Sequence, residues 1–236
     1  MSELFGRRVV DVRPQFPIVS FTFDDFPRSA LHAGGAILRE FGARGTYYVA
    51  LGLMDREIPA GKAFSVEDLR SVLDEGHELG CHTFAHCHAW ETSPSVFEES
   101  IIENRRVFEA LVPGVAFKTL SYPIANPRPQ TKRRASKYFL CCRGGGESFN
   151  IGPTDANNLQ ARFLEKNRQN PDVFKRLIDE NCAAHGWLIL ATHDVCETPT
   201  PFGCSPDFLE GIVRYATKSG AKVLPVIKAW EAIIGN

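Results

Sequence analysis

The sequence predicts an α/β protein whose strands form a closed or nearly closed β/α barrel. Three observations support this: short apolar runs alternate with helical patterns, no linker or low-complexity segment interrupts them, and polar side chains gather directly after the apolar runs. Strands separated by helices pair in parallel through right-handed crossovers, and about eight of them suggest a barrel. We therefore expect a single domain over residues 1–236.

The alternation can be followed element by element. Strands are expected over 18–23, 46–51, 118–122, 138–142, 161–164, 187–192 and 222–227. Helices are expected over 29–41, 65–75, 93–111, 172–185 and 206–218. Ser65 and Asp68 form a capping signature for the second helix, and Ser93-Pro94 opens the third. The period of apolar residues separates the two kinds of element.

Composition excludes several classes of protein. With 44% hydrophobic and 23% charged residues, the chain resembles an ordinary soluble globular protein. Its 27 basic and 28 acidic residues give a net charge of −1, which offers no electrostatic case for nucleic acid or an anionic membrane as partner. A neutral or weakly charged carbohydrate or small acylated substrate fits better.

Cysteine usage and the N-terminus favour a cytoplasmic location. Seven cysteines are an odd number, include the neighbours Cys141 and Cys142, and contain no C-x-x-C, so reduced thiols are expected. The first eight residues lack the architecture of a signal peptide. No apolar run approaches the roughly 18 residues that a membrane helix needs.

Acids and histidines directly follow three of the predicted strands. They are Asp24 and Asp25 after the first strand, His82 and His86 after a short apolar segment that we take as a further strand between 46–51 and 118–122, and His193 and Asp194 after the strand over 187–192. In a β/α barrel the carboxyl ends of the strands form the catalytic rim, so these side chains can share one mouth. A carboxylate and two imidazoles leave coordination positions open for water and substrate, as a catalytic divalent ion requires.

These segments resemble the motifs of the polysaccharide deacetylases that carry a NodB homology domain. Thr22-Phe23-Asp24-Asp25 resembles the first motif, HTFAH over 82–86 matches H-[ST]-x-x-H, and LATHD over 190–194 resembles the last. The resemblance implies an irregular (β/α)7 barrel and metal-dependent hydrolysis of an N- or O-acyl group on a sugar. It implies metal ligands Asp25, His82 and His86, a general base Asp24 and a general acid His193. Zinc is the first choice of metal, and Co, Ni, Mn or Fe would also suit these ligands.

Taken by themselves, the residues leave the roles of the two aspartates open. Adjacent side chains on a strand point to opposite faces, but the backbone turns at a strand end, so Asp24 and Asp25 can both reach the site. One would then bind metal while the other takes a proton from water, and a histidine would protonate the leaving amine.

Each motif also has a structural interpretation. Asp24-Asp25 before Phe26-Pro27 could form a turn and a helix cap, and His193-Asp194 could simply end a strand. The histidines over 82–86 lie beside thiols that could form a structural zinc site, although a second cysteine pair at finger-like spacing is missing.

The chain departs from the family pattern in the third motif. Ser121-Tyr122-Pro123 stands where many members have an R-P-P-Y-G-like run whose arginine holds the catalytic aspartate. We expect Arg162, at the end of the strand over 161–164, to supply the missing charge; the alternative is a surface arginine. Tyr122 and Pro123 are expected to bind substrate.

The fourth motif, an acid that orients the catalytic histidine, is not clear. Asp155 is the nearest candidate, although a loop acid is an equally good interpretation. The glycines over 144–146 and Glu147 suggest a phosphate-binding loop, but a following Lys-Ser/Thr and helix are missing, so we expect a flexible loop over the site. Trp90 and Phe26 could stack on a sugar ring or pack in the core.

Together these observations predict a cytoplasmic, metal-dependent carbohydrate deacylase that removes acetyl from an N-acetylated sugar or oligosaccharide. Two alternatives remain: a hydrolase of a non-sugar linear or cyclic amide, and a catalytically silent carbohydrate-binding protein on the same scaffold. A binding protein needs no base and acid around one ion, so the full set of acids and histidines favours an enzyme.

Overall fold

Parallel strands curl into a barrel in the computed structural model, which describes residues 4–124 and 126–235. The strand order is β10-β11-β2-β3-β6-β7-β8, and β12 pairs with β2. The strands are β2 (Ile18–Phe23), β3 (Thr46–Val49), β6 (Glu78–Cys81), β7 (Thr119–Ser121), β8 (Cys141–Arg143), β10 (Arg162–Phe163), β11 (Trp187–Thr192) and β12 (Lys222–Val223). Between β8 and β10, backbone N–H groups of Gly144 and Gly146 donate to Leu159 and Ala161. The predicted irregular barrel is confirmed.

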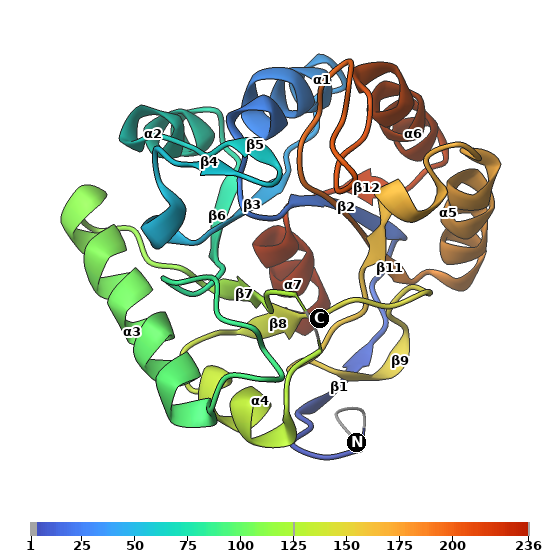
Figure 1. The fold of residues 1–236 in the computed structure, drawn as a ribbon. Helices are drawn as coiled ribbons and strands as arrows, with labels where there is room; N and C mark the ends of the chain where they lie inside the picture. Colours follow the sequence, from blue (N-terminus) through green and yellow to red (C-terminus); the bar gives the residue numbers. More distant parts are fainter. Residues whose placement is uncertain (1–3, 125, 236) are drawn as a thin grey trace.

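Helices pack around the strands, and the last of them, α7, lies across one end of the barrel (Figure 1). They are α1 (Ala36–Glu40), α2 (Val66–Asp74), α3 (Pro94–Leu111), α4 (Pro129–Ala135), α5 (Asp172–Ala184), α6 (Pro206–Lys218) and α7 (Val226–Ile234). The predicted capping box is present, with Ser65 accepting from the Asp68 N–H and Asp68 accepting from the Ser65 N–H. The helix expected over 29–41 starts instead as a π-helix, Ala30–Gly35, and becomes α-helical only at α1.

Two antiparallel pairs lie outside the barrel and were not expected from the sequence. They are β1 (Val9–Val12) with β9 (Gly152–Asp155), and β4 (Glu57–Ile58) with β5 (Gly61–Lys62). Because β1 and β9 are far apart in the chain, no local turn pattern in the sequence could predict their pairing. The first pair joins the N-terminal segment to the loop after β8.

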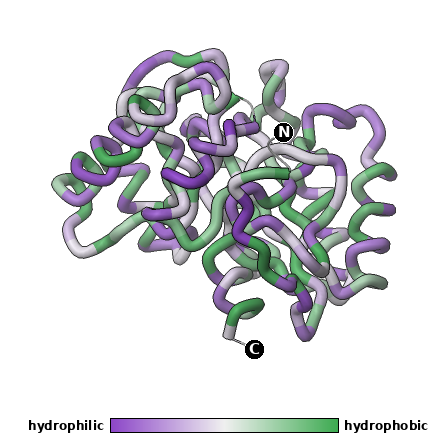
Figure 2. Tube along the Cα trace, turned by 90° about the horizontal axis from the view of Figure 1, so that it is seen from below, coloured by the Kyte–Doolittle hydropathy of each residue, from purple (hydrophilic) through white to green (hydrophobic). Residues whose placement is uncertain are grey.

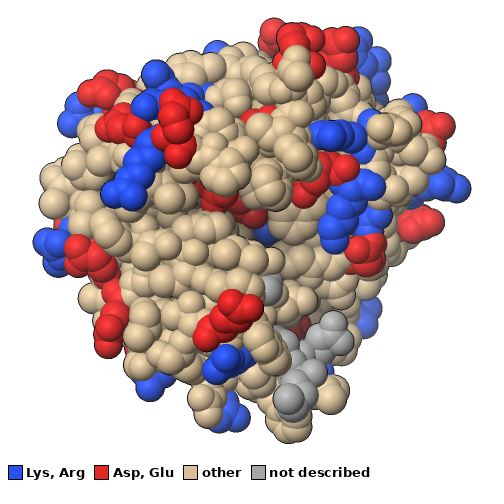
Figure 3. All heavy atoms as spheres, viewed as in Figure 1, with Lys and Arg blue, Asp and Glu red and all other residues tan. Residues whose placement is uncertain are grey.

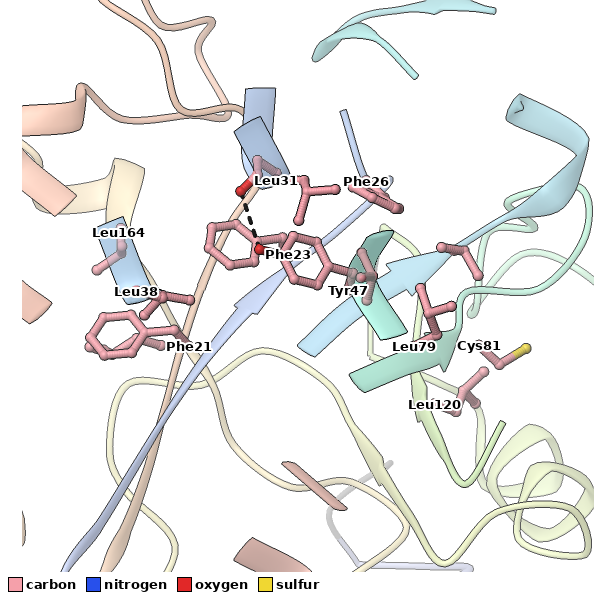
Figure 4. Packing of buried hydrophobic residues seen from close by; sticks show 14 of the residues in the cluster. Phe21, Phe23, Phe26, Leu31, Leu38, Tyr47, Leu79, Cys81, Leu120 and Leu164 are labelled. Carbon is pink, nitrogen blue, oxygen red and sulfur yellow. Dashed lines mark hydrogen bonds between the residues drawn. The ribbon is translucent and has the colours of Figure 1, made fainter. Parts of the chain in front are cut away.

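The central strands are buried on both faces, as parallel strands in a barrel should be. Along β2, Val19, Phe21 and Phe23 point outward into the core beneath the helices. Figure 4 shows this layer, in which Phe23 stacks on Tyr47 with ring centroids 4.8 Å apart. The alternate residue Ile18 belongs to a second core inside the barrel. The two-residue period of a strand therefore sorts the side chains of β2 between two cores.

Helix α7 closes the lower end of the barrel and corrects one prediction. The strand expected over 222–227 ends at Val223, and α7 begins at Val226 after Pro225. The first N–H groups of α7 donate to neighbouring side chains: Val226 N–H to Thr46 Oγ1 at 2.9 Å, and Ile227 N–H to Glu78 Oε2 at 2.8 Å. These acceptors come from β3 and β6, so the helix start depends on tertiary contacts. Figure 2 shows the C-terminal end of the chain at the lower edge of the molecule.

The thiol prediction agrees with the structure, in which all seven cysteines are free. Among the residues that the structure describes, none of the helices is both long enough and apolar enough to span a bilayer. Residues 1–3, on which part of the N-terminal prediction rests, lie outside the described residues.

Candidate active site

The two aspartates reach the same cleft because the backbone changes conformation between them. Ser20 and Thr22 alternate with the outward phenylalanines of β2, and Asp24 continues this inward set. Asp25 has a φ of 58°, a left-handed conformation that non-glycine residues adopt rarely. Both aspartates line the cleft, as expected for a turn at the strand end. Such backbone conformations cluster at functional sites.

The histidine motif follows β6 in the same way. His82 continues the inward face of Glu78 and Gly80, and its Nδ1 lies 2.8 Å from the carbonyl oxygen of Ser121. A carbonyl can only accept, so Nδ1 carries the hydrogen and the Nε2 lone pair stays free. His86 has a φ of 50°, which turns its ring back toward His82, with ring centroids 5.0 Å apart.

The donor set formed by Asp25, His82 and His86 fits a divalent ion. One ligand atom from each residue lies within 4.8 Å of the other two. The Asp25 Oδ1 is 3.4 Å from His82 Nε2 and 3.0 Å from His86 Nε2, yet it is buried without a hydrogen bond of good geometry. These three side chains therefore form a candidate site for a divalent ion, with one possible ligand atom from each. The hydrogen bond that His82 donates to the Ser121 carbonyl is the kind of outer support that metal-binding histidines usually have.

The cation beside Asp24 is Arg143, which corrects the prediction for Arg162. Arg143 Nη2 forms a buried ion pair with Asp24 Oδ1, and the guanidinium carbon lies 4.9 Å from the Tyr48 ring centroid. Arg162 instead pairs with Glu147 and donates to Asn167. The reason is register: Arg143 ends β8 opposite Ser121 and points into the barrel, whereas Arg162 lies on the short strand β10.

The charges around Asp24 and Asp25 favour ionised carboxylates. Burial alone would raise the pKa of Asp24, but Arg143, followed by His82 and His193, outweighs it and holds the pKa below its usual value. Burial is likewise the largest single effect on Asp25, and His82 and His86 overcome it, so its pKa is also lowered. Asp24 therefore remains able to accept a proton at neutral pH.

His193 lies across the cleft and is oriented by the backbone. Its Nδ1 donates to the carbonyl oxygen of Phe202 at 3.1 Å, which leaves Nε2 for a substrate, and its ring stacks on Phe163 with centroids 6.1 Å apart. Asp155, predicted to orient this histidine, instead pairs with Lys132 at 2.6 Å. Asp155 lies on β9, which pairs with β1, and its carboxylate contacts α4 through Lys132. It is therefore not next to β11, which precedes His193.

The loop that carries Phe202 is held by Asp194. This buried carboxylate accepts from the N–H of Thr200 at 2.9 Å and from its hydroxyl at 2.5 Å. Gly203 lies so close that a Cβ there would be 2.3 Å from the Asp194 carboxyl carbon. The last motif thus contains two different functions: His193 faces the cleft, and Asp194 fixes the loop that orients it.

One cleft of about 1250 Å³ is lined by Asp24, Asp25, His82, His86 and His193. Figure 3 shows the hollow in the middle of the face, with acidic atoms inside it. Of the two residues expected to bind substrate, Tyr122 lines the cleft, whereas Pro123 is buried outside the cleft lining and its carbonyl accepts from the Ala89 N–H. Phe26 packs in the core against Phe64, and Trp90 is partly exposed away from the cleft lining.

The sequence interpretation missed Glu165 and mistook the glycine run. Glu165 lines the cleft beside Asp24, and its Oε2 is buried without a hydrogen-bond partner among residues 4–124 and 126–235. Burial, followed by the charge of Asp24, raises its pKa to about 7. Only its position directly after the predicted strand over 161–164 marks it in the sequence. Gly144 and Gly146 line the cleft, but their backbone is hydrogen-bonded to the neighbouring segment rather than forming an open loop.

Comparisons with known sequences agree with the motifs. The family model described as polysaccharide deacetylase matches residues 11–140, more than half of the chain. A peptidoglycan-N-acetylglucosamine deacetylase from Bacillus cereus is 30% identical over 96 residues, which are 40% of this chain and 41% of that protein. A gellan lyase from a Bacillus species is 22% identical over 197 residues, 76% of this chain and 8% of that protein. The chain spans less than half of either relative.

Solved structures share the fold. The chitin deacetylase of the fungus Colletotrichum lindemuthianum superposes with a TM-score of 0.66 at 18% identity, over 92% of this chain and 89% of that chain. A family 4 acetyl xylan esterase from Clostridium thermocellum, in complex with a cobalt ion, gives 0.58 at 19%, over 90% of both chains. A CE4 family pseudoenzyme from Bacillus anthracis gives 0.64 at 14%, over 93% and 67%.

Proposed function

Because the chain belongs to the polysaccharide deacetylase family, we propose that it is a metal-dependent hydrolase that removes N-acetyl groups from a sugar or oligosaccharide. The observation that carries the proposal is the convergence of a complete reactive set on one cleft. An ionised Asp24 lies next to three metal-compatible donors, and His193 faces it from another strand. A binding protein would have no use for this combination.

Asp25, His82 and His86 would hold the ion, with zinc the first choice for one carboxylate and two imidazoles. When bound, the ion supplies Lewis-acid polarisation of the acyl oxygen and activation of water. The Ser121 carbonyl keeps His82 in the tautomer that binds metal, and the left-handed backbone at Asp25 aims its carboxylate at the two rings.

Asp24 and His193 would divide the proton transfers. Asp24, held ionised by Arg143, takes a proton from the attacking water, and its fixed orientation comes from the same buried ion pair. A protonated His193 keeps its Nδ1 hydrogen on the Phe202 carbonyl and gives its Nε2 proton to the leaving nitrogen. The C–N bond breaks, acetate leaves, and the sugar keeps a free amine.

The test is acetate release by metal-reconstituted protein from a panel of N-acetylated oligosaccharides and small amides. We expect acetate from the sugars; release from the small amides alone would favour the non-sugar alternative. Bound metal with sugar binding but no turnover would favour the silent binding protein.

His193→Ala gives a more specific test of the mechanism. It should keep metal and fold, lose most activity on an amide, and lose less on an ester with a good leaving group, because such an alkoxide needs less help from an acid. Wild-type rates on both substrates would contradict the assignment of the acid.

A further inference from the structure

Arg143 reaches Asp24 across the interior of the barrel. It ends β8, which does not neighbour β2, because the strand order places β3, β6 and β7 between them on one side and β10 and β11 on the other. The arginine is only 1% exposed, so its side chain runs through protein and not through solvent. A long side chain with several rotatable bonds needs further contacts to keep a single orientation.

The hydrogen bonds of the guanidinium do not by themselves fix its plane. Nη2 pairs with Oδ1 of Asp24, and Nη1 donates a long hydrogen bond of 3.4 Å to the Gly144 carbonyl. Nε has no hydrogen-bond partner among residues 4–124 and 126–235. A bidentate pair would fix the planes of both groups, whereas this pair joins one nitrogen to one oxygen. Another contact must therefore hold the guanidinium where it reaches Asp24.

Two aromatic rings from different strands lie against the guanidinium. Its central carbon is 4.9 Å from the ring centroid of Tyr48, on β3, and 5.6 Å from that of Phe163, on β10. At such distances the electron-rich face of a ring attracts a cation, and the attraction is stronger away from water. Tyr48 is the closer of the two and is fully buried, whereas Phe163 is partly exposed and also stacks on His193.

Gly80 provides the space for the Tyr48 ring. It is the register partner of Tyr48 on β6, and a Cβ there would lie 2.4 Å from the ring. Glycine has no side chain, so the ring can occupy this space. Tyr48 is not among the residues that line the cleft. An effect of Tyr48 on turnover must therefore pass through a neighbour.

We propose that Tyr48 is a positioning residue, whose ring holds the guanidinium of Arg143 in the orientation that pairs with Asp24. This inference rests on the proposed function, in which Asp24 takes a proton from water, and it adds to that reaction a residue outside the cleft. When the attraction of the ring is weakened, the guanidinium leaves Asp24 for part of the time. Turnover then slows, whereas the metal ligands and the groups that contact substrate stay in place.

The test changes the electrostatics of the ring while nearly preserving its shape. Tyr48→Phe keeps the ring face and should retain most of the wild-type kcat. Trifluorophenylalanine at the same position withdraws electron density from that face, so it should lower kcat a further ~3- to 10-fold, with KM and bound metal unchanged. A ring that only fills space would give the same kcat in both proteins, and this result would overturn the proposal.

Tyr47, the neighbour on β3, gives a matched control. Its ring belongs to the outer core and stacks on Phe23, so trifluorophenylalanine there should give the same kcat as Tyr47→Phe. In protein that also carries Arg143→Met, fluorination at position 48 should no longer lower kcat, because the guanidinium is gone. An equal loss at both positions, or an equal loss with and without the arginine, would assign the effect to packing and overturn the proposal.

A stability measurement separates the contact from the chemistry. Denaturant unfolding should show that fluorination at position 48 lowers the free energy of unfolding more when Arg143 is present than in Arg143→Met. If wild type releases no acetate but this difference holds, the proposed function fails and the contact between ring and guanidinium stands. Acetate release with a kcat that does not respond to fluorination leaves the function and removes the positioning role.

Discussion

Strand β6 carries the starting points of two different sites on one face, Glu78 at its beginning and His82 just beyond its end. The two residues are four positions apart, which is roughly 13 Å along a strand. Between them, Gly80 packs so closely that a Cβ would lie 2.4 Å from the Tyr48 ring. The lower site is structural and the upper one is the candidate active site, so one strand allows their chemistry to be compared directly.

The lower site satisfies its carboxylate with neutral donors. Glu78 accepts from Thr119 at 2.5 Å, from Thr46 at 2.8 Å and from the Ile227 N–H at 2.8 Å. Burial outweighs these bonds and raises its pKa to about 7. Its lone pairs are occupied by three elements, so it holds β3, β7 and α7 together.

The upper site surrounds its carboxylates with cationic or metal-compatible groups, and Asp25 Oδ1 has no hydrogen bond of good geometry in the described part of the chain. Burial is the largest effect at both ends, yet the pKa of Asp24 is lowered while that of Glu78 is raised. This difference shows that burial alone does not determine the charge of a carboxylate. Nearby cationic groups can outweigh burial and lower the pKa, whereas neutral hydrogen-bond donors here do not. Substitutions at the upper end should therefore change chemistry, and those at the lower end should change stability.

The largest expected effect is from His82→Ala. Loss of one of three ligands should reduce bound metal to background and abolish metal-dependent turnover, while the melting temperature of the metal-free protein changes little. Metal analysis of the purified proteins measures this. His32→Ala, whose ring pairs with Asp68 at the surface, should retain full metal content. Equal metal in His82→Ala and wild type would remove His82 from the ligand set.

The second largest effect is expected from Asp24→Asn, which should lower kcat by ~10²-fold or more. The amide cannot take a proton from water, but the three ligands remain, so metal content should match wild type. Rate per bound metal, rather than rate per protein, is the quantity to compare. Loss of metal with a normal rate per remaining ion would mean that the two aspartates have exchanged roles.

Arg143→Met should lower activity ~10- to 100-fold, as expected when a supporting contact is removed. Without the guanidinium, the pKa of Asp24 rises, so more of it is protonated at a given pH and the acid limb of the pH–rate profile moves to higher pH. Because a buried carboxylate loses its partner, unfolding should also become easier by about 3 kcal/mol.

Arg162→Met is the matched control for the arginine. Its partner Glu147 is exposed, so the acid limb should stay in place. A shift of the limb in Arg162→Met, and none in Arg143→Met, would reverse the assignment that the structure makes.

Glu78→Gln should have the smallest effect on activity, with kcat/KM at the wild-type level. Its effect lies in the pH dependence of unfolding. With a pKa of 4.5 when unfolded and about 7 when folded, Glu78 holds a proton in the native state that the unfolded chain releases between these values. Wild-type stability therefore falls as pH rises through this window, by about 3 kcal/mol in total. Denaturant unfolding at pH 5 and pH 8 should show a smaller fall in Glu78→Gln.

Sequence patterns predicted the elements whose signals are local. The inward position of Asp24 follows from the alternation along β2, and the Ser65 cap follows from its spacing to Asp68. The convergence of Asp25, His82 and His86 followed from placing motifs at strand ends. The catalytic roles of these residues stay predictions, because the structure shows where they lie and not what they do.

What the sequence missed depends on contacts between distant segments. The strand expected over 138–142 ended one residue before Arg143, and this error concealed the inward position of the arginine. Helix α7 begins where Thr46 and Glu78 supply acceptors, which no pattern near residue 226 can indicate. The π-helical turn Ala30–Gly35 likewise reflects tight packing, since a Cβ at Gly35 would lie 2.9 Å from the Tyr47 hydroxyl.

Two of the site's three imidazoles, His82 and His193, are oriented by main-chain carbonyls, those of Ser121 and Phe202. Every amino acid has such a carbonyl, so the identity of the residue is free to vary while the hydrogen bond is kept. An evolving chain can exchange either side chain without losing the orientation of the ring. The residues that cannot vary freely are those that fix the path of the backbone, such as Gly203. This part of the site therefore depends on backbone geometry and leaves no sequence motif.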